Sequence, residues 1–132
     1  NEGHPILNWL KDEISVLAWV PAALWITVIL FFSVLPIRSG LPLTVGHFDK
    51  MAHFFEYMFL AVLIARGIYR TKSQFPPRSI LIALIFMVGY GILMELVQQF
   101  VPGRCASIAD VAANVTGAGF GLFLGKMVIW QK

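Results

Sequence analysis

Four long and nearly uninterrupted apolar segments limit what this chain can fold into more than any other feature of its sequence. They run from about Ile14 to Leu35, Met51 to Ile68, Ile80 to Phe100 and Ile108 to Trp130. Each has about 18 to 23 residues, and a helix needs about 20 apolar residues to cross the hydrocarbon core of a bilayer. The apolar residues are continuous, without the alternation typical of membrane β-strands. The sequence therefore predicts an all-α polytopic membrane protein with four transmembrane helices.

The composition of the chain supports the same fold class. Hydrophobic residues make up 58% of the 132 residues and charged residues 13%, whereas soluble domains are about 25% charged. A soluble domain of this size buries too small a fraction of its surface to hide so much apolar area. The net charge of +3 comes from scattered basic residues, so we expect membrane lipid as a partner and no nucleic acid. No sequence feature sets an oligomeric state.

The chain divides into a short N-terminal segment and one membrane domain. It begins with Asn1 rather than methionine, so residues 1–13 are expected to be an N-terminal interfacial segment or an artificial remnant. Within them, residues 5–13 would form a short amphipathic helix along the membrane surface. Residues 14–132 are expected to form a single four-helix domain.

The distribution of basic residues predicts the orientation in the membrane. Four spans place both termini and the second loop on one side, and seven of the ten Lys and Arg residues are there. Because loops rich in these residues stay in the cytoplasm, we expect both termini to be cytoplasmic. The basic residues on that side are Lys11, Arg66, Arg70, Lys72, Arg78, Lys126 and Lys132, and those on the outer side are Arg38, Lys50 and Arg104.

Polar residues inside or beside the predicted spans gather at their outer ends. They are Asp49, Lys50, His53, Glu56 and Tyr57 at the second span, Glu95, Gln98 and Gln99 at the third, and Ser107, Asp110 and Asn114 at the fourth. Most are three or four residues apart, which gives each helix one polar face. The three faces lie at a similar depth, about two helical turns or roughly 9 Å from the outer surface. We therefore expect the three helices to meet at an outward-facing polar pocket.

The carboxylates of this pocket are expected to face inward. A carboxylate at the bilayer centre costs about 2.5 to 3.5 kcal/mol, so Glu56, Glu95 and Asp110 would face one another rather than lipid. Three carboxylates close together repel, so one is expected to be protonated or to hold a cation. The protein cations available at that depth are Lys50, His53 and Arg104.

A stripe of small residues predicts how the fourth span packs. Gly117, Gly121 and Gly125 recur every four residues, a spacing that permits close approach of another helix. Asp110 and Asn114 continue this stripe toward the outer end. The packing of the stripe would therefore turn both polar residues into the bundle.

Two runs of residues resemble the VanZ-like family. The run from Asp49 to Tyr57 is similar to its aspartate-lysine, histidine and tyrosine motif, and the run from Glu95 to Arg104 is similar to its glutamate, glutamine and proline-glycine-arginine motif. Asp110, Asn114 and Gly117 match its closing aspartate, asparagine and glycine.

This resemblance extends from about Leu35 to Gly125 and implies a cellular location more than a reaction. The family is named for a protein associated with low-level resistance to the glycopeptide antibiotic teicoplanin. It implies a multi-pass protein of the bacterial cytoplasmic membrane with a role in the cell envelope. Together with the predicted orientation, it implies that the polar pocket faces outward.

Recognition of an anionic envelope lipid, or of a lipid-linked cell-wall precursor, is the favoured function. Lys50, His53 and Arg104 would hold phosphate, and arginine offers a planar two-pronged donor for it. The full set of predicted ligand-binding residues is Asp49, Lys50, His53, Tyr57, Glu95, Gln98, Gln99, Arg104, Asp110 and Asn114.

Other interpretations remain open. In a membrane-embedded enzyme, His53 would be the general base and Glu95 or Asp110 its orienting or acidic partner, so these three are the catalytic candidates. The same groups would also suit a purely structural polar network that locks the helices together. We expect no metal and no other cofactor, because His53 is the lone histidine within the spans and no paired-histidine motif is present. Ion passage ranks last, because it needs polar groups across the whole membrane.

Overall fold

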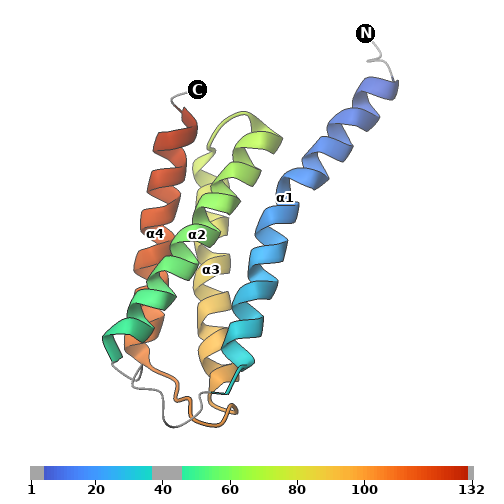
Figure 1. The fold of residues 1–132 in the computed structure, drawn as a ribbon. Helices are drawn as coiled ribbons and strands as arrows, with labels where there is room; N and C mark the ends of the chain where they lie inside the picture. The colour runs from blue at the N-terminus through green and yellow to red at the C-terminus, as the bar shows by residue number, and fades with distance from the viewer. Residues whose placement is uncertain (1–4, 37–45, 131–132) are drawn as a thin grey trace.

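The computed structural model describes residues 5–36 and 46–130, and these residues form four helices and no strand (Figure 1). The helices are α1 (Pro5–Val34), α2 (Gly46–Lys72), α3 (Pro77–Gln98) and α4 (Ile108–Trp130). Each contains a stretch long and apolar enough to cross a membrane. The predicted all-α fold with four membrane-spanning helices is therefore confirmed.

The helices run alternately up and down, so their ends gather at two levels. α1 begins and α4 ends at one level, where α2 also connects to α3 (Figure 1). At the other level α1 ends, α2 begins, α3 ends and α4 begins. We call this second level the polar end, because the polar residues singled out in the sequence lie there.

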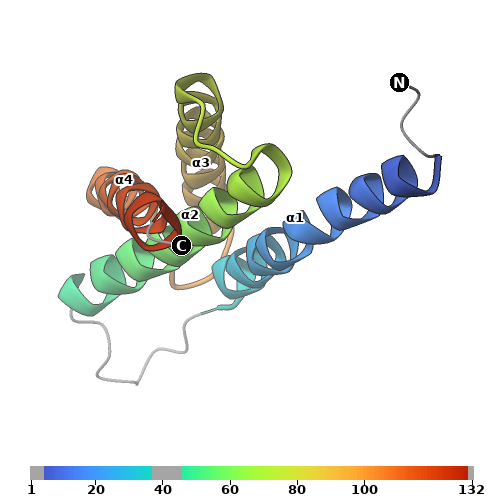
Figure 2. The same ribbon diagram turned by 90° about the horizontal axis from the view of Figure 1, so that it is seen from above.

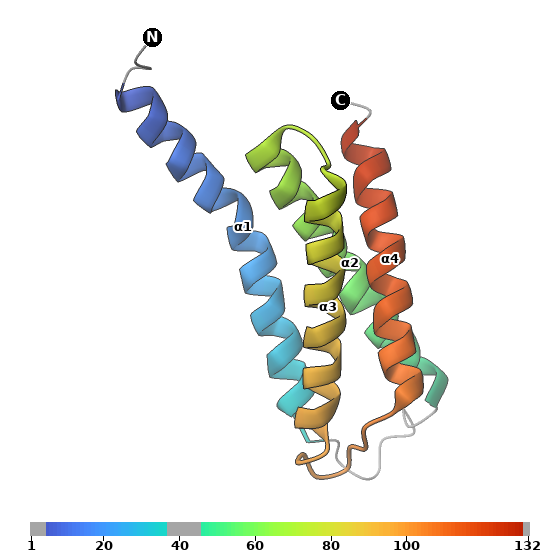
Figure 3. The same cartoon turned by 180° about the vertical axis from the view of Figure 1, so that it is seen from behind.

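α2 and α3 lie between the two outer helices. Among the described residues both contact every other helix, whereas α1 and α4 do not contact each other. Seen along the bundle, α1 and α4 lie on opposite sides (Figure 2), and from behind α3 covers the space between them (Figure 3). The most extensive contact joins α2 and α4.

The glycine stripe of α4 makes this close contact possible. A Cβ at Gly117 would overlap the main-chain oxygen of Phe54, and one at Gly121 would overlap that of Met58. Gly125 likewise faces Ala65, whose Cβ would be 2.6 Å from an added Cβ. The stripe therefore packs against α2, which confirms the prediction that it faces another helix rather than lipid.

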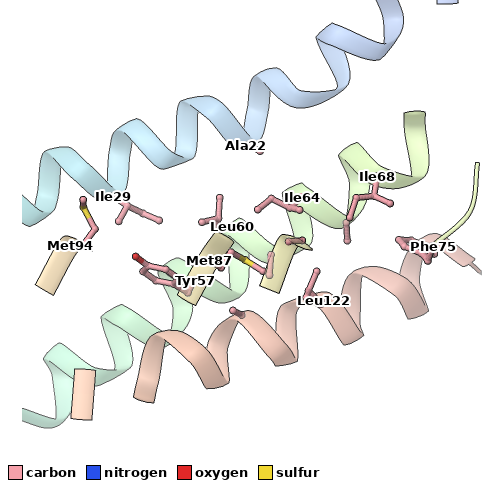
Figure 4. Close-up of a cluster of buried hydrophobic side chains, with 14 residues drawn as sticks. Ala22, Ile29, Tyr57, Leu60, Ile64, Ile68, Phe75, Met87, Met94 and Leu122 are labelled. Carbon is pink, nitrogen blue, oxygen red and sulfur yellow. The ribbon is translucent and has the colours of Figure 1, made fainter. Parts of the chain in front are cut away.

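The bundle encloses a narrow apolar core. Its largest fully buried apolar side chains include Ile29 of α1, Tyr57 and Leu60 of α2 and Met87 of α3 (Figure 4). Many large apolar residues remain exposed on the outer surfaces of all four helices. In water this exposure would be unfavourable, but in a bilayer these surfaces are solvated by lipid.

The helix boundaries differ from the predicted spans at several points. α2 begins at Gly46, five residues before the predicted start at Met51, because Asp49 in its first turn and basic residues in its last turn favour a helix beyond the apolar stretch. α1 continues without a break from Pro5 through Pro21, so residues 5–13 belong to the same helix as the first span. Their position along the membrane surface stays a prediction.

Candidate functional site at the polar end

Polar side chains from all four helices are buried at the polar end. In the described part of the chain, the buried polar residues are Ser33 of α1, His53 of α2, Glu95 and Gln98 of α3, and Asp110 and Asn114 of α4. The polar faces predicted for the second, third and fourth spans therefore do meet inside the bundle. We call the group formed by Asp49, Lys50, His53, Glu95, Asp110 and Asn114 the polar cluster.

Histidine, lysine and carboxylates alternate within this cluster. The His53 Nε2 atom lies 3.8 Å from Glu95 Oε1 and 3.9 Å from Asp49 Oδ1. The Lys50 Nζ atom lies 3.5 Å from Asp110 Oδ1, which is longer than a hydrogen bond but within ion-pair distance. The side chains of Asp49 and Lys50 are 49% and 42% exposed, whereas those of the other three are at most 6% exposed. Asp49 and Lys50 therefore form the entrance to a buried interior.

Glu95 connects α3 to the start of α4. Its Oε2 accepts a hydrogen bond of 3.0 Å from the main-chain N–H of Ser107, which directly precedes α4. N–H groups at a helix start lack partners within the helix, and the helix dipole favours a negative charge there. One carboxylate oxygen thus has a structural role, while the other faces His53.

Arg104 connects the turn between α3 and α4 to the end of α1. Its Nε donates to the main-chain oxygen of Leu35 at 3.0 Å, and its Nη2 donates to that of Phe32 at 2.9 Å. These carbonyls lie in and just beyond the last turn of α1, where main-chain oxygens lack partners within the helix. The two-pronged donor that we predicted would hold phosphate is directed at backbone carbonyls.

Sequence reasoning missed Ser33. The Gln98 Nε2 donates to Ser33 Oγ at 3.4 Å, which links α3 to α1. A polar residue near the outer end of an otherwise apolar span was the available signal. Gln99 behaves differently from Gln98, because α3 ends at Gln98 and Gln99 is exposed. Gln99 is thus exposed, whereas Glu95 and Gln98, with which it was expected to share a polar face, are buried.

Asn114 and Tyr57 lie deepest at this end and are completely or almost completely buried. Neither the amide atoms of Asn114 nor the Tyr57 hydroxyl has a hydrogen-bond partner among the described residues. Gly91 of α3 provides room for both, since an added Cβ would lie 3.1 Å from Asn114 Nδ2 and 3.5 Å from Tyr57 Cε1. Each unsatisfied buried polar group costs about 1 to 3 kcal/mol, and in known structures water or a ligand usually satisfies it.

Glu56 lies beside the cluster and is half-buried. Its main-chain oxygen accepts a hydrogen bond of 2.9 Å from Trp25 Nε1, which holds α1 against α2. Its carboxylate interacts electrostatically with His53, Arg104 and Asp49. Glu56 therefore places a further carboxyl group at this end of the bundle.

Three side chains of the cluster have the arrangement of ligands around one cation. One carboxylate oxygen each of Asp49 and Asp110 and one ring nitrogen of His53 lie within 4.8 Å of one another. Metal–ligand distances in proteins are about 2.0 to 2.6 Å, so two ligands of one ion lie at most about 5 Å apart. The cluster thus has the residue types and the spacing for a metal site.

Two cavities lie away from the polar cluster. An apolar groove of about 430 Å³ is lined by residues of α1, α2 and α3 that include Trp19, Ile64 and Phe86. A second cavity of about 370 Å³ lies where α2 and α4 end, and Arg66 and Arg70 contribute to its lining. Neither includes a residue of the cluster.

A comparison with protein families supports the resemblance noted in the sequence. The family model for VanZ/LLP1 matches residues 8–130, which is nearly the whole chain. Searches of curated proteins and of solved structures gave no match. The matched region includes α2, α3 and α4, all but the first three residues of α1 and every residue of the polar cluster, so the chain belongs to the VanZ/LLP1 family.

Proposed function

We propose that this membrane protein recognises the phosphate-bearing headgroup of an anionic cell-envelope lipid or lipid-linked cell-wall precursor at its polar end. The observation that carries the proposal is the set of buried polar atoms that lack hydrogen-bond partners among the described residues, next to a half-exposed lysine. If the polar cluster served only to hold the helices together, its own side chains would be expected to supply hydrogen-bond partners for these atoms. A headgroup can supply partners of both kinds. Its phosphate oxygens would accept hydrogen bonds from the Asn114 amide nitrogen and the Tyr57 hydroxyl, and its hydroxyl groups would donate to the oxygens of Glu95 and Asp110.

The surroundings of the entrance suit a lipid. Large apolar side chains are exposed around it, including Phe48, Met51 and Phe55 of α2 and Ile108 of α4. Acyl chains would pack against these side chains while the phosphate lies beside Lys50. Lysine is a common phosphate ligand that acts as a compact positive charge.

The proposed location is the outer face of the bacterial cytoplasmic membrane. Lys and Arg are concentrated at the level where α1 begins and α4 ends, and such residues mark the cytoplasmic side. The polar end would then face outward, where cell-wall precursors are used. Binding of such a precursor would also change how much of it is available to teicoplanin, which gives a physical route to glycopeptide resistance.

Lipid binding by purified protein in nanodiscs tests the proposal. We expect the wild-type chain to retain phosphatidylglycerol in preference to phosphatidylcholine, as measured by native mass spectrometry. Lys50→Gln should abolish this preference, because it removes the cation at the entrance. Lys126→Gln is the matched control, since Lys126 is exposed on α4 far from the polar end. An equal loss in both variants, or no preference in the wild type, would contradict the proposal.

An enzymatic role is the second candidate, and the position of His53 favours it. Its Nε2 lies between Asp49 and Glu95, and a carboxylate beside a histidine orients the ring for general-base catalysis. Hydrolysis of a lipid-linked phosphate by the purified protein would support this role. His53→Gln should then abolish turnover, whereas Lys126→Gln, on α4 far from the polar end, should retain it.

A further inference from the structure

Among the described residues, carboxyl groups outnumber the permanently charged basic side chains around the polar cluster. The carboxyl groups are those of Asp49, Glu56, Glu95 and Asp110, and the basic side chains are Lys50 and Arg104. Arg104 donates two of its hydrogen bonds to the end of α1 rather than to these carboxylates. Uncompensated charge within a membrane is costly, so the carboxyl groups in excess of these two basic side chains must be protonated or bind a further cation.

The cluster also brings together three metal-binding side chains from two helices. Asp49 and His53 are one turn apart on α2, and Asp110 approaches them from the first turn of α4. The close contact between α2 and α4, which the α4 glycines permit, holds these helices at a fixed separation. The three side chains are therefore positioned by the most tightly packed pair of helices in the described fold.

A second and independent observation points to a ligand at the same place. His53 Nδ1, Glu95 Oε1 and Asp110 Oδ1 are buried and have no hydrogen-bond partner among the described residues. The side chains that carry them are 94% or more buried. Asp110 Oδ1 also lies 3.5 Å from Lys50 Nζ, at ion-pair distance. A cation coordinated by His53 and Asp110 would use lone pairs that no hydrogen bond occupies among the described residues.

We propose that Asp49, His53 and Asp110 bind a divalent metal ion, and that this ion contacts the phosphate of the lipid headgroup. One imidazole nitrogen with two carboxylates suits Zn²⁺ or Mn²⁺ better than Mg²⁺, which prefers oxygen ligands alone. Three protein ligands leave a coordination position for a phosphate oxygen. Glu95 Oε1 lies 3.8 Å from His53 Nε2, beyond hydrogen-bond distance, so Glu95 lies next to the site without being one of its three ligands. The ion site stands on its own residues, and only its contact with phosphate rests on the proposed function.

This inference replaces the expectation of no metal, which rested on the single histidine within the spans. The sequence contains no HxxxH or HExxH pattern. The fold supplies the carboxylate of Asp110 from a helix more than fifty positions further along the chain. In the described residues, the ligand set exists only after α2 and α4 have packed together.

Metal binding by the purified full-length chain tests the site. After bound metal is removed with a chelator and Zn²⁺ or Mn²⁺ is added back, we expect inductively coupled plasma mass spectrometry to find one ion per chain. In competition, Mg²⁺ should bind more weakly than either ion. Asp49→Asn should weaken Zn²⁺ affinity by at least about 100-fold, because loss of even an outer partner of a metal ligand costs about 10- to 100-fold. Glu13→Gln is the control, since Glu13 is exposed near the start of the first span.

Asp49→Asn is preferred to Asp110→Asn because Asp49 is half-exposed. The substitution should therefore leave the unfolding temperature of the chelated, metal-free protein unchanged. His53→Gln supplies a second variant, and the Mn²⁺-loaded wild type should show nitrogen hyperfine coupling in its electron paramagnetic resonance spectrum that this variant lacks. Equal metal content in the wild type, Asp49→Asn and Glu13→Gln would show adventitious surface binding only and overturn the proposal. So would a wild-type content well below one ion per chain.

Lipid retention with and without Zn²⁺ separates this inference from the proposed function. If Zn²⁺ increases phosphatidylglycerol retention in the wild type but not in Asp49→Asn, the ion contacts the headgroup. If Zn²⁺ binds without any preference for phosphatidylglycerol, the ion site stands and lipid recognition fails. If the preference is present without Zn²⁺ and unaffected by it, lipid recognition stands and the metal–phosphate contact fails. Competition by inorganic phosphate distinguishes a site for free phosphate from a site that requires the lipid.

Discussion

At the scale of single residues, the polar end combines groups that hold the fold together with groups that do not. Arg104 and one oxygen of Glu95 satisfy main-chain groups at the ends of α1 and α4. Asn114 and His53 are buried beside them with unsatisfied atoms. The first group explains how the helix ends are joined, and the second explains why we place a ligand there.

The contacts of Arg104 predict the effect of a conservative substitution. Arg104→Lys preserves the charge but replaces a planar two-pronged donor by a single ammonium group, which cannot reach Leu35 and Phe32 oxygens in the same geometry. We expect a loss of about 1 to 2 kcal/mol in the free energy of unfolding, close to the value of one or two hydrogen bonds. Denaturant unfolding in detergent measures it.

Lipid retention by Arg104→Lys should be measured beside its stability. If Arg104 serves the fold, both should fall together and be restored together at lower temperature. A variant with wild-type stability and no lipid retention would instead make Arg104 a direct phosphate ligand, as the sequence alone predicts.

At the scale of helices, the contact between α2 and α4 determines the geometry of the site. Asp49, Lys50 and His53 come from α2, and Asp110 and Asn114 come from α4. In lipid no hydrophobic effect drives helices together, so their association relies on close packing and on polar contacts. The glycines of α4 allow the backbones to approach, and the polar cluster lies at one end of this contact.

Substitution of these glycines should therefore separate the packing face from the lipid face of α4. Gly121→Leu places a large side chain against Met58 and Ala61. We therefore expect the free energy of unfolding to fall by about 1 to 3 kcal/mol, the usual cost of overpacking. Gly119→Leu is the matched control, because nothing lies within 4 Å of a Cβ added at this exposed position. Thermal unfolding in detergent compares the two variants. Equal stability of both would contradict the observed packing.

At the scale of the whole molecule, the two ends of the helical bundle differ from each other in their polar and charged residues. One end holds the polar cluster, and the other holds Arg66, Arg70, Lys72 and Arg78 where α2 connects to α3. This asymmetry is what predicts the orientation in the membrane. A protein with its basic end in the cytoplasm would present the polar cluster to the outer surface.

The single cysteine allows a direct test of this orientation. Cys105 is exposed in the turn between α3 and α4 at the polar end. A membrane-impermeant maleimide should label it in cells whose cytoplasmic membrane is intact, after permeabilisation of any outer membrane. As a control, Lys72→Cys in a Cys105→Ser background should react only after the cytoplasmic membrane is lysed. The reverse pattern would show that the polar end faces the cytoplasm.

The sequence by itself determined the helices, the faces they bury and the end of the bundle where polar groups collect. Length and continuous hydrophobicity are sufficient for a membrane span, and spacings of three and four residues place Asp110, Asn114 and the glycines on one face of one helix. These are local properties, so no partner needs to be known. For this reason, the residues of the predicted stripe are indeed buried in α4.

Only the tertiary structure decided which groups from different helices meet. The position of Arg104 in the sequence does not indicate that its side chain donates hydrogen bonds to the end of α1. Likewise, the residues around Gln98 do not indicate that Ser33 is its partner. Gln99 is exposed at the C-terminal end of α3, whereas Glu95 and Gln98 are buried by the other helices. The grouping of Asp49, His53 and Asp110 likewise depends on the rotation and separation of α2 and α4. Periodicity fixes the direction of a side chain from its own helix, whereas its neighbours across the bundle depend on long-range packing.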